Sequence, residues 1–195
     1  MFDLNLCNEE FNVFGIDIKI LERNDLSLLC KWRNNPQVRK NMEDRREVNE
    51  MILNVWFNNI LEKPDYLGYI CSCNGKKFGY EEIKDINFET DSAVCGTYFD
   101  QEYINAGLFV NVFLCRELIL RDINISTVIA KVRKENKNSI SLQKRLGGVI
   151  SEEDDDFFIF QLKKDGRIKA LRFLAEALGL SAAFDKEFTE WSKLP

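Results

Sequence analysis

The sequence contains no histidine, and this absence excludes a large part of enzyme chemistry. Without an imidazole, neither a Ser-His-Asp triad nor a Cys-His pair can form. Long apolar runs are also absent, so no segment predicts a membrane span, and the first residues lack the basic and apolar segments of a secretory signal. We therefore expect a cytoplasmic protein without a membrane partner.

The cysteines argue against a metal site. The chain has six, and only Cys71 and Cys73 lie close together in the sequence. No second cysteine pair and no histidine is present to complete a zinc site, so we predict no metal. In a reducing compartment, scattered cysteines behave as small buried hydrophobic residues.

Length and charge restrict the remaining classes. A chain of 195 residues with 45% apolar residues predicts one domain with a full hydrophobic core and room for a terminal extension. The net charge of −5 argues against a nucleic-acid partner.

Hydrophobic periodicity predicts alternating strands and helices in the first half of the chain. The apolar stripe of Val48, Met51, Ile52, Val55, Trp56 and Ile60 indicates one amphipathic helix. Asn74-Gly75 supplies the positive φ angles that a tight hairpin turn needs. The expected elements are a strand or hairpin over 11–21, a helix from Asn24 or Asp25 to Pro36, a helix over 45–61, and paired strands over 66–73 and 77–85.

The second half continues with a strand over 92–100, a nearly all-apolar helix from Leu108 to about Arg121, and a final hairpin over 148–162. After Gly166, the sequence predicts helices with Phe184, Phe188 and Trp191 on one side. We therefore divide the chain into a domain over 1–165 and a helical extension over 166–195. The extension would pack on the domain or on a second subunit, so a homodimer is one expectation.

The stretch over 127–148 is central to the fold. Its first part alternates β-branched and small or charged residues, as a strand does, and Asn138 is a suitable N-cap for a following helix. Gly147-Gly148 would end that helix. Because free backbone N–H groups gather at a helix N-terminus, this junction is a candidate anion or cofactor edge.

Taken in order, these elements and three stretches of sequence resemble the GNAT superfamily of acetyl-CoA-dependent N-acetyltransferases, over about residues 16–163. The stretches are 21–39 with Trp32-Arg33-Asn34, Asn54-Val55-Trp56-Phe57 before the Asn74-Gly75 hairpin, and Asn136-x-x-Ser139-x-x-Leu142-x-x-x-Leu146-Gly147. The first two look most like the ribosomal-protein and amino-sugar branches of the superfamily.

The resemblance implies an α/β (α+β) fold with a mixed, twisted sheet of six to seven strands flanked by helices. It implies an acyltransferase that moves an acetyl group from acetyl-CoA to a small-molecule primary amine. An amino sugar on a nucleotide-sugar, used for surface polysaccharide or flagellin glycans, is the expected acceptor. The alternatives are N-terminal acetylation of a protein, and a binding module that has lost catalysis.

Cofactor residues follow from the same resemblance. The superfamily's pyrophosphate turn aligns with Ile104, Asn105, Ala106, Gly107, Leu108 and Phe109. Gly107 is kept, but the first polar residue of the motif is Ile104 here, and the last small position is Phe109, whose ring would obstruct the cofactor. The backbone near Tyr98-Phe99 would bind the thioester oxygen. Further along the chain, the resemblance assigns cofactor contacts to Asn136, Ser139 and Lys144, of which the first two are equally suited to cap a helix.

The catalytic acid and base are not at their usual places. The superfamily's carboxylate and tyrosine positions align with Val94 and Gln143, which can do neither task. We predict that Glu81 or Glu82 faces the reaction site and acts as base, with Tyr98 as a further catalytic candidate. Arg33, Asn34 and Tyr80 are the candidate substrate residues. For each of these, a structural role in the core or on the surface is the competing interpretation.

Overall fold

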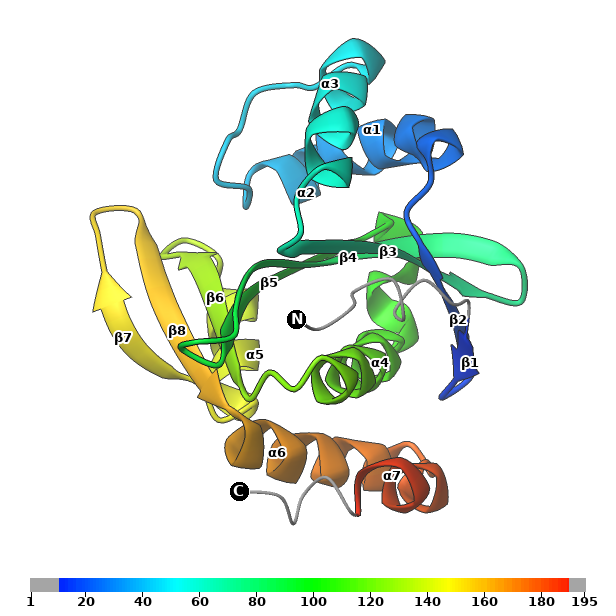
Figure 1. The fold of residues 1–195 in the computed structure, drawn as a ribbon, viewed down its shortest axis with the longest axis vertical. Helices are drawn as coiled ribbons and strands as arrows, with labels where there is room; N and C mark the ends of the chain where they lie inside the picture. Colours follow the sequence, from blue (N-terminus) through cyan, green and yellow to red (C-terminus); the bar gives the residue numbers. More distant parts are fainter. Residues whose placement is uncertain (1–10, 190–195) are drawn as a thin grey trace.

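The computed structural model describes residues 11–189, which form one twisted sheet with helices on both faces (Figure 1). The described sheet has eight strands in the order β1-β2-β3-β4-β5-β6-β8-β7. This is more than the six to seven expected, because the first apolar segment folds into a hairpin of β1 (Phe11–Val13) and β2 (Ile16–Ile20). Gly15 supplies the turn with a φ of +76°.

The other strands agree closely with the sequence periodicity. They are β3 (Tyr66–Cys73), β4 (Lys76–Asn87), β5 (Ser92–Phe99), β6 (Thr127–Arg133), β7 (Val149–Glu153) and β8 (Phe157–Lys163). The turn between β3 and β4 is formed as predicted, since Asn74 and Gly75 both have positive φ angles, of 51° and 73°. All neighbouring strands are antiparallel except β5 and β6, which are parallel and are joined by a crossover helix.

The helices lie in two layers (Figure 1). The helices are α1 (Leu26–Asn34), α2 (Pro36–Arg39), α3 (Glu50–Leu61), α4 (Phe109–Asp122), α5 (Lys137–Arg145), α6 (Lys164–Ala177) and α7 (Ser181–Phe188), with short 3-10 turns at Arg23–Asp25 and Gln101–Ala106. On one face, α1 and α3 enclose a small core with Trp32, Phe57 and Tyr80. On the other face, α4, α6 and α7 cover the main core.

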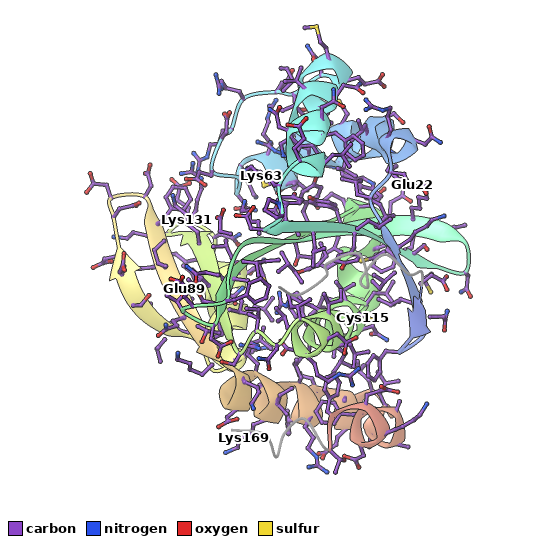
Figure 2. The ribbon with its side chains drawn as sticks, in the orientation of Figure 1. Glu22, Lys63, Glu89, Cys115, Lys131 and Lys169 are labelled. Atoms are coloured by element: carbon purple, nitrogen blue, oxygen red, sulfur yellow. The ribbon has the colours of Figure 1, made fainter. Side chains whose placement is uncertain are left out.

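The crossover helix α4 is buried nearly all round, as its sequence predicts. Side chains fill the space between α4 and the sheet, where Cys115 is fully buried (Figure 2). Two charged residues of α4 are also buried, and both are paired: Arg116 with Glu81, and Glu117 with Arg167 of α6. The guanidinium of Arg167 donates to both Glu117 carboxylate oxygens, at 2.7 and 2.9 Å.

The C-terminal helices pack on the domain. Ile168, Leu171, Phe184 and Phe188 belong to the same buried core as the sheet. Whether residues 166–195 form a separable unit, and whether the protein dimerises, stay predictions. Two sequence expectations, for a buried thiol at Cys7 and for Trp191 on the last helix, lie outside the described residues.

The helix expected over 45–61 is shorter than predicted, and it buries a different face from the predicted one. It begins at Glu50, because the Asn49 side chain accepts a hydrogen bond from the Ile52 N–H at 2.9 Å and caps it. The predicted stripe is only partly buried. Its members Met51, Ile52 and Val55 are exposed, while the helix buries Leu53 and Phe57 against the sheet and α1.

Candidate functional site

The parallel strands β5 and β6 separate soon after they meet. Their pairing covers three residue pairs, from Ser92↔Thr127 to Val94↔Ile129. Beyond it, β5 continues to Phe99 paired only with β4, and β6 continues to Arg133 paired only with β8. We call this divergence, between 95–99 of β5 and 130–133 of β6, the splay. The two strands are therefore unpaired with each other at their ends, near Phe99 and Val132.

Backbone N–H groups of β5 point into the splay. The Asp100 N–H donates to the Phe78 carbonyl oxygen of β4 at 2.8 Å. N–H directions alternate along a strand, so the N–H groups of Thr97 and Phe99 point away from β4 and toward β6. Beyond the pairing, β6 offers them no ladder partner. The splay thus presents donors for an oxygen that gains negative charge, close to where the resemblance placed them.

The ring of Phe99, the last residue of β5, is directed toward β4 and away from the splay. The Phe99 ring stacks on Phe78, with ring centroids 6.1 Å apart, and lies over Gly79 of β4. A Cβ at Gly79 would come within 2.6 Å of that ring. The ring therefore packs above β4, and Gly79 provides the space that keeps it there.

Glu81 and Glu82 point to opposite faces of β4, as adjacent strand residues do. Glu82 lies on the face covered by α1 and α3, directly across from Gly96 of β5. Its carboxylate accepts hydrogen bonds from the Tyr66 hydroxyl at 2.9 Å and from the Lys84 ammonium at 2.7 Å. A Cβ at Gly96 would be 2.8 Å from the Glu82 Oε1, so the carboxylate lies over Gly96 itself, next to the splay.

Three tyrosines surround this carboxylate. The hydroxyls of Tyr66 and Tyr80 are hydrogen-bonded to each other, and the Tyr80 and Tyr98 rings are 5.1 Å apart. Tyr80 is 2% exposed, which supports the structural interpretation of this residue over direct substrate contact. Burial raises the pKa of Tyr98, the Glu82 carboxylate raises it further, and the Arg33 guanidinium lowers it. The Tyr98 hydroxyl is therefore within electrostatic reach of both groups.

Glu81 lies on the opposite face, under α4, and is 1% exposed. Its carboxylate is 3.6 Å from the Arg116 guanidinium and accepts a hydrogen bond from the Thr97 hydroxyl. Burial raises the pKa of Glu81 to about 7, although Arg116 and Thr97 act to lower it. Of the two glutamates, Glu82 is the more accessible, with its side chain 20% exposed.

The segment that follows β5 forms a 3-10 helix over 101–106 rather than an open turn. Asp100 fixes its start by accepting a hydrogen bond from the Glu102 N–H at 3.2 Å, and also accepts one from the Trp32 indole at 2.9 Å. Gly107 then adopts a φ of +74°, and α4 begins at Phe109. The structure does not describe the side chains of Ile104, Asn105 and Ala106, so their cofactor contacts stay predictions.

A scan against protein-family models and a search of curated proteins found no match. A search of solved structures matched the spermidine N-acetyltransferase from Vibrio cholerae in complex with CoA and spermine, with a TM-score of 0.69 and 17% identity over 79% of this chain and 98% of that chain. RimJ from Mycobacterium smegmatis in complex with CoA-disulfide matched with a TM-score of 0.69 and 12% identity over 88% of this chain and 93% of that chain.

RimL, a ribosomal L7/L12 alpha-N-protein acetyltransferase in complex with coenzyme A, matched with a TM-score of 0.67 and 14% identity over 81% of this chain and 99% of that chain. This chain has the GNAT acetyltransferase fold. The predicted fold class is confirmed, including the strand–helix unit at its centre.

Within the GNAT fold, α5 is the helix that the Asn136 motif predicted. Its N-cap is Asn136 and not Asn138, since the Asn136 side chain accepts a hydrogen bond from the Ser139 N–H at 3.1 Å. Lys144 is exposed near the end of this helix. The predicted obstruction by Phe109 stays a prediction, although its ring packs edge-to-face on Phe113, with centroids 6.2 Å apart.

The two candidate substrate residues of α1 have different surroundings. The Asn34 side-chain amide bonds both main-chain groups of Val48, donating to the carbonyl oxygen at 2.6 Å and accepting from the N–H at 2.9 Å. This use of both amide ends favours a structural role. The Arg33 guanidinium donates to the main-chain oxygen of Asp44, while its other terminal nitrogen, Nη1, is buried without a partner.

Sequence reasoning did not identify several residues of this site. Tyr66, Lys84 and Thr97 bind the two glutamates from positions that carry no motif. The one available signal was glycine in the middle of strands. Gly96 leaves room for Glu82, and Gly68 of β3 leaves room for the Tyr80 hydroxyl, 3.3 Å from a Cβ built there.

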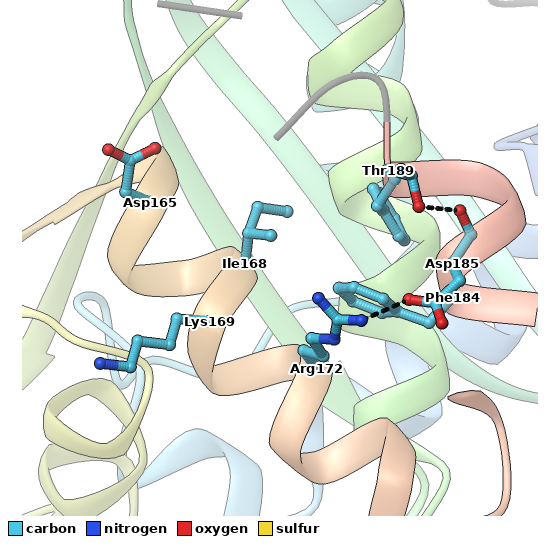
Figure 3. A pocket seen from close by; sticks show the side chains of 8 residues that line it. Asp165, Ile168, Lys169, Arg172, Phe184, Asp185 and Thr189 are labelled. Carbon is cyan, nitrogen blue, oxygen red and sulfur yellow. Dashed lines mark hydrogen bonds and ion pairs between the residues drawn. The ribbon is translucent and has the colours of Figure 1, made fainter. Parts of the chain in front are cut away.

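A separate groove lies between α6 and α7, away from the splay (Figure 3). It is lined by apolar Ile168 and Phe184 and by an ion pair of Arg172 with Asp185 at 2.9 Å. Among residues 11–189, no cluster of acidic, cysteine or histidine side chains has the arrangement to hold a metal ion. None of the helices in the described part of the chain has the length and hydrophobicity to cross a membrane.

Proposed function

We propose that this protein is an acetyl-CoA-dependent N-acetyltransferase that acts on a small primary amine. One observation carries the proposal: the Glu82 carboxylate lies over Gly96, beside the inward-pointing N–H groups of the splay. A base for the amine and donors for the acyl oxygen are thus adjacent.

The residues present fit acetyl-CoA. Strands β5 and β6 are unpaired over the length in which a thioester arm would lie, and the Phe99 ring lies away from it. Gly107 and the N-terminus of α4 follow directly, where backbone N–H groups favour a phosphate. Acetyl-CoA would supply the activated acetyl group. Asn136, Ser139 and Lys144 are proposed contacts for the rest of the cofactor.

The roles of the chain's own residues follow from their positions. Glu82 takes a proton from the acceptor ammonium and leaves a neutral amine as nucleophile. The amine nitrogen then forms a bond to the acetyl carbon as the carbon–sulfur bond breaks. The N–H groups of Thr97 and Phe99 stabilise the charge that develops on the acyl oxygen. The Tyr98 hydroxyl, on the same face as Glu82, gives a proton to the departing sulfur. The second proton of the attacking nitrogen, lost as the amide forms, restores this hydroxyl.

We further propose an amino sugar on a nucleotide-sugar as acceptor, because the segments around Trp32 and Trp56 resemble that branch of the superfamily. Similarity to RimL and RimJ keeps N-terminal protein acetylation as the second candidate. A panel of nucleotide-linked amino sugars, polyamines and N-terminal peptides, assayed for release of the CoA thiol and for acetylated product by mass spectrometry, would separate them.

A Glu82→Gln variant tests the catalytic assignment. We expect its kcat to fall about a hundredfold to ten-thousandfold, the usual contribution of a general base, with little change in the KM for acetyl-CoA. Glu89→Gln, in the exposed loop after β4, is the matched control and should keep full activity. Unchanged kcat in Glu82→Gln would remove Glu82 from the mechanism. If calorimetry detects no binding of millimolar acetyl-CoA to the unmodified protein, a binding module replaces the enzyme.

A further inference from the structure

Arg33 of α1 carries a charge that the described part of the protein leaves unpaired. Its Nη2 donates to the main-chain oxygen of Asp44, but its Nη1 is buried and has no hydrogen-bond partner. Burial lowers the pKa of Arg33 and the Asp44 carboxylate acts to raise it, but the hydrogen bonds of that carboxylate go to Arg46, with three contacts between 2.7 and 3.0 Å. Arg33 as a whole is half-buried, but a buried guanidinium nitrogen without a partner is costly unless an anion binds it.

The position of Arg33 is fixed on both sides. Its neighbour Trp32 donates to Asp100, which holds the last turn of α1 over the end of β5. Its other neighbour, Asn34, holds Val48 through both amide ends, and Arg133 of β6 donates to the main-chain oxygens of Met42 and Glu43 at 2.7 and 2.8 Å. The loop over 42–48 is therefore tied to both α1 and β6 and holds the Arg33 guanidinium in place.

The candidate acceptor site lies beside this guanidinium. Trp32, the neighbour of Arg33, packs in one cluster with Tyr80 and Tyr98 and donates to Asp100, two residues after Tyr98. In agreement with this arrangement, the pKa of Tyr98 is raised by burial and by Glu82 and lowered by Arg33. The Glu82 carboxylate and the Arg33 guanidinium thus both act on the Tyr98 phenol.

We propose that Arg33 is an anion subsite, and that the acceptor carries a carboxylate or phosphate group within reach of the amine that Glu82 deprotonates. The proposal rests on the proposed N-acetyltransferase function and narrows its substrate class. A guanidinium fork pairs with either anion through two N–H groups, one of which is the buried Nη1. Acceptors whose only charges are positive, such as polyamines, would place a second cation against Arg33.

The test compares acceptors that differ only in the anion. Paired acceptors are β-alanine with β-alaninamide, and phosphoethanolamine with ethanolamine, with spermidine as the polycation. For the unmodified protein, we expect the anionic member of at least one pair to have a kcat/KM about tenfold to a hundredfold higher, as a charged hydrogen bond supplies. The pair that shows the difference tells whether the anion is a carboxylate or a phosphate.

Arg33→Gln should abolish that preference through KM, with kcat and the neutral acceptors little changed. Lys31→Gln removes one exposed charge from the same helix and should keep the preference. Equal losses for anionic and neutral acceptors in Arg33→Gln, or a preference of the unmodified protein for spermidine, would overturn the proposal.

A second readout separates this inference from the function on which it rests. If neither these acceptors nor the nucleotide-sugar, polyamine and peptide panel is acetylated, and acetyl-CoA does not bind, the N-acetyltransferase function is wrong. Titration of inorganic phosphate, followed by the tryptophan fluorescence to which Trp32 beside the subsite contributes, then tests the anion site alone. Binding to the unmodified protein that is lost in Arg33→Gln, but kept in Lys31→Gln, supports it, and equal weak binding to all three contradicts it.

Discussion

The buried carboxylate of Glu81 makes a sharp prediction about how stability depends on pH. Its ordinary pKa is 4.5, and burial raises it to about 7 in the folded protein. Between these values the unfolded chain has lost the Glu81 proton while the folded protein still holds it. The free energy of unfolding therefore decreases as the pH rises from 4.5 to 7, and the stabilisation held below pH 4.5 is lost above pH 7.

The magnitude follows from the shift. At about 1.4 kcal/mol per pKa unit, the full loss is about 3 kcal/mol, of which about 2 kcal/mol falls above pH 5.5. Glu81→Gln cannot ionise. We expect its free energy of unfolding, relative to the unmodified protein, to rise by about 2 kcal/mol between pH 5.5 and pH 8. Other titrating groups are common to both proteins and cancel in this difference.

Urea unfolding at half-unit pH steps from 5.5 to 8 is the appropriate assay. Lower values are avoided because the sequence pI is about 5.0 and a chain near its pI associates readily. Glu89→Gln, which removes an exposed carboxylate, should follow the unmodified protein throughout. Parallel curves for Glu81→Gln and the unmodified protein would refute the reasoning, since Arg116 would then compensate the burial of Glu81 completely.

Three further changes test the fold and the site. Arg167→Met leaves the buried Glu117 carboxylate unpaired, so we expect the free energy of unfolding, measured in urea, to fall by about 3–5 kcal/mol. Arg172→Met, which breaks an exposed ion pair, is the control. A smaller loss in Arg167→Met than in Arg172→Met would contradict this expectation. Gly96→Ala places a Cβ against Glu82, and kcat should fall at least about tenfold with an unchanged KM for acetyl-CoA, whereas full activity would show that the carboxylate can shift freely. Asn136→Ala removes a helix cap and should cost about 1 kcal/mol of stability, and a KM for acetyl-CoA that stays within twofold would remove Asn136 from the proposed cofactor contacts.

The helix before β3 shows where sequence patterns stop being sufficient. Its apolar residues lie on two overlapping faces of the helix, and the periodicity alone predicted that the face with Met51 and Val55 is buried. The structure buries Leu53 and Phe57 instead, because these meet α1 and the sheet. Its start was also misplaced, since the residues before Asn49 lie in the loop that Asn34 holds through Val48.

The candidate site was predictable in part. Strand alternation alone places Glu81 and Glu82 on opposite faces, so the sequence indicated that one of them would face the reaction site. Which one depends on what covers each face. The structure encloses Glu81 under α4 and places Glu82 over Gly96, a residue 14 positions away in the chain that the β4–β5 register brings opposite.

The sequence by itself determined the local features: the Asn74-Gly75 turn, the buried crossover helix, and the order of elements that resembles the GNAT superfamily. These depend on backbone preferences and apolar periodicity within a few residues. Only the tertiary structure decided how far β5 and β6 stay paired, which glutamate is enclosed, and that one buried nitrogen of Arg33 has no hydrogen-bond partner among the described residues. Pairing and burial depend on groups that are distant in the sequence, and no local pattern encodes which of them meet.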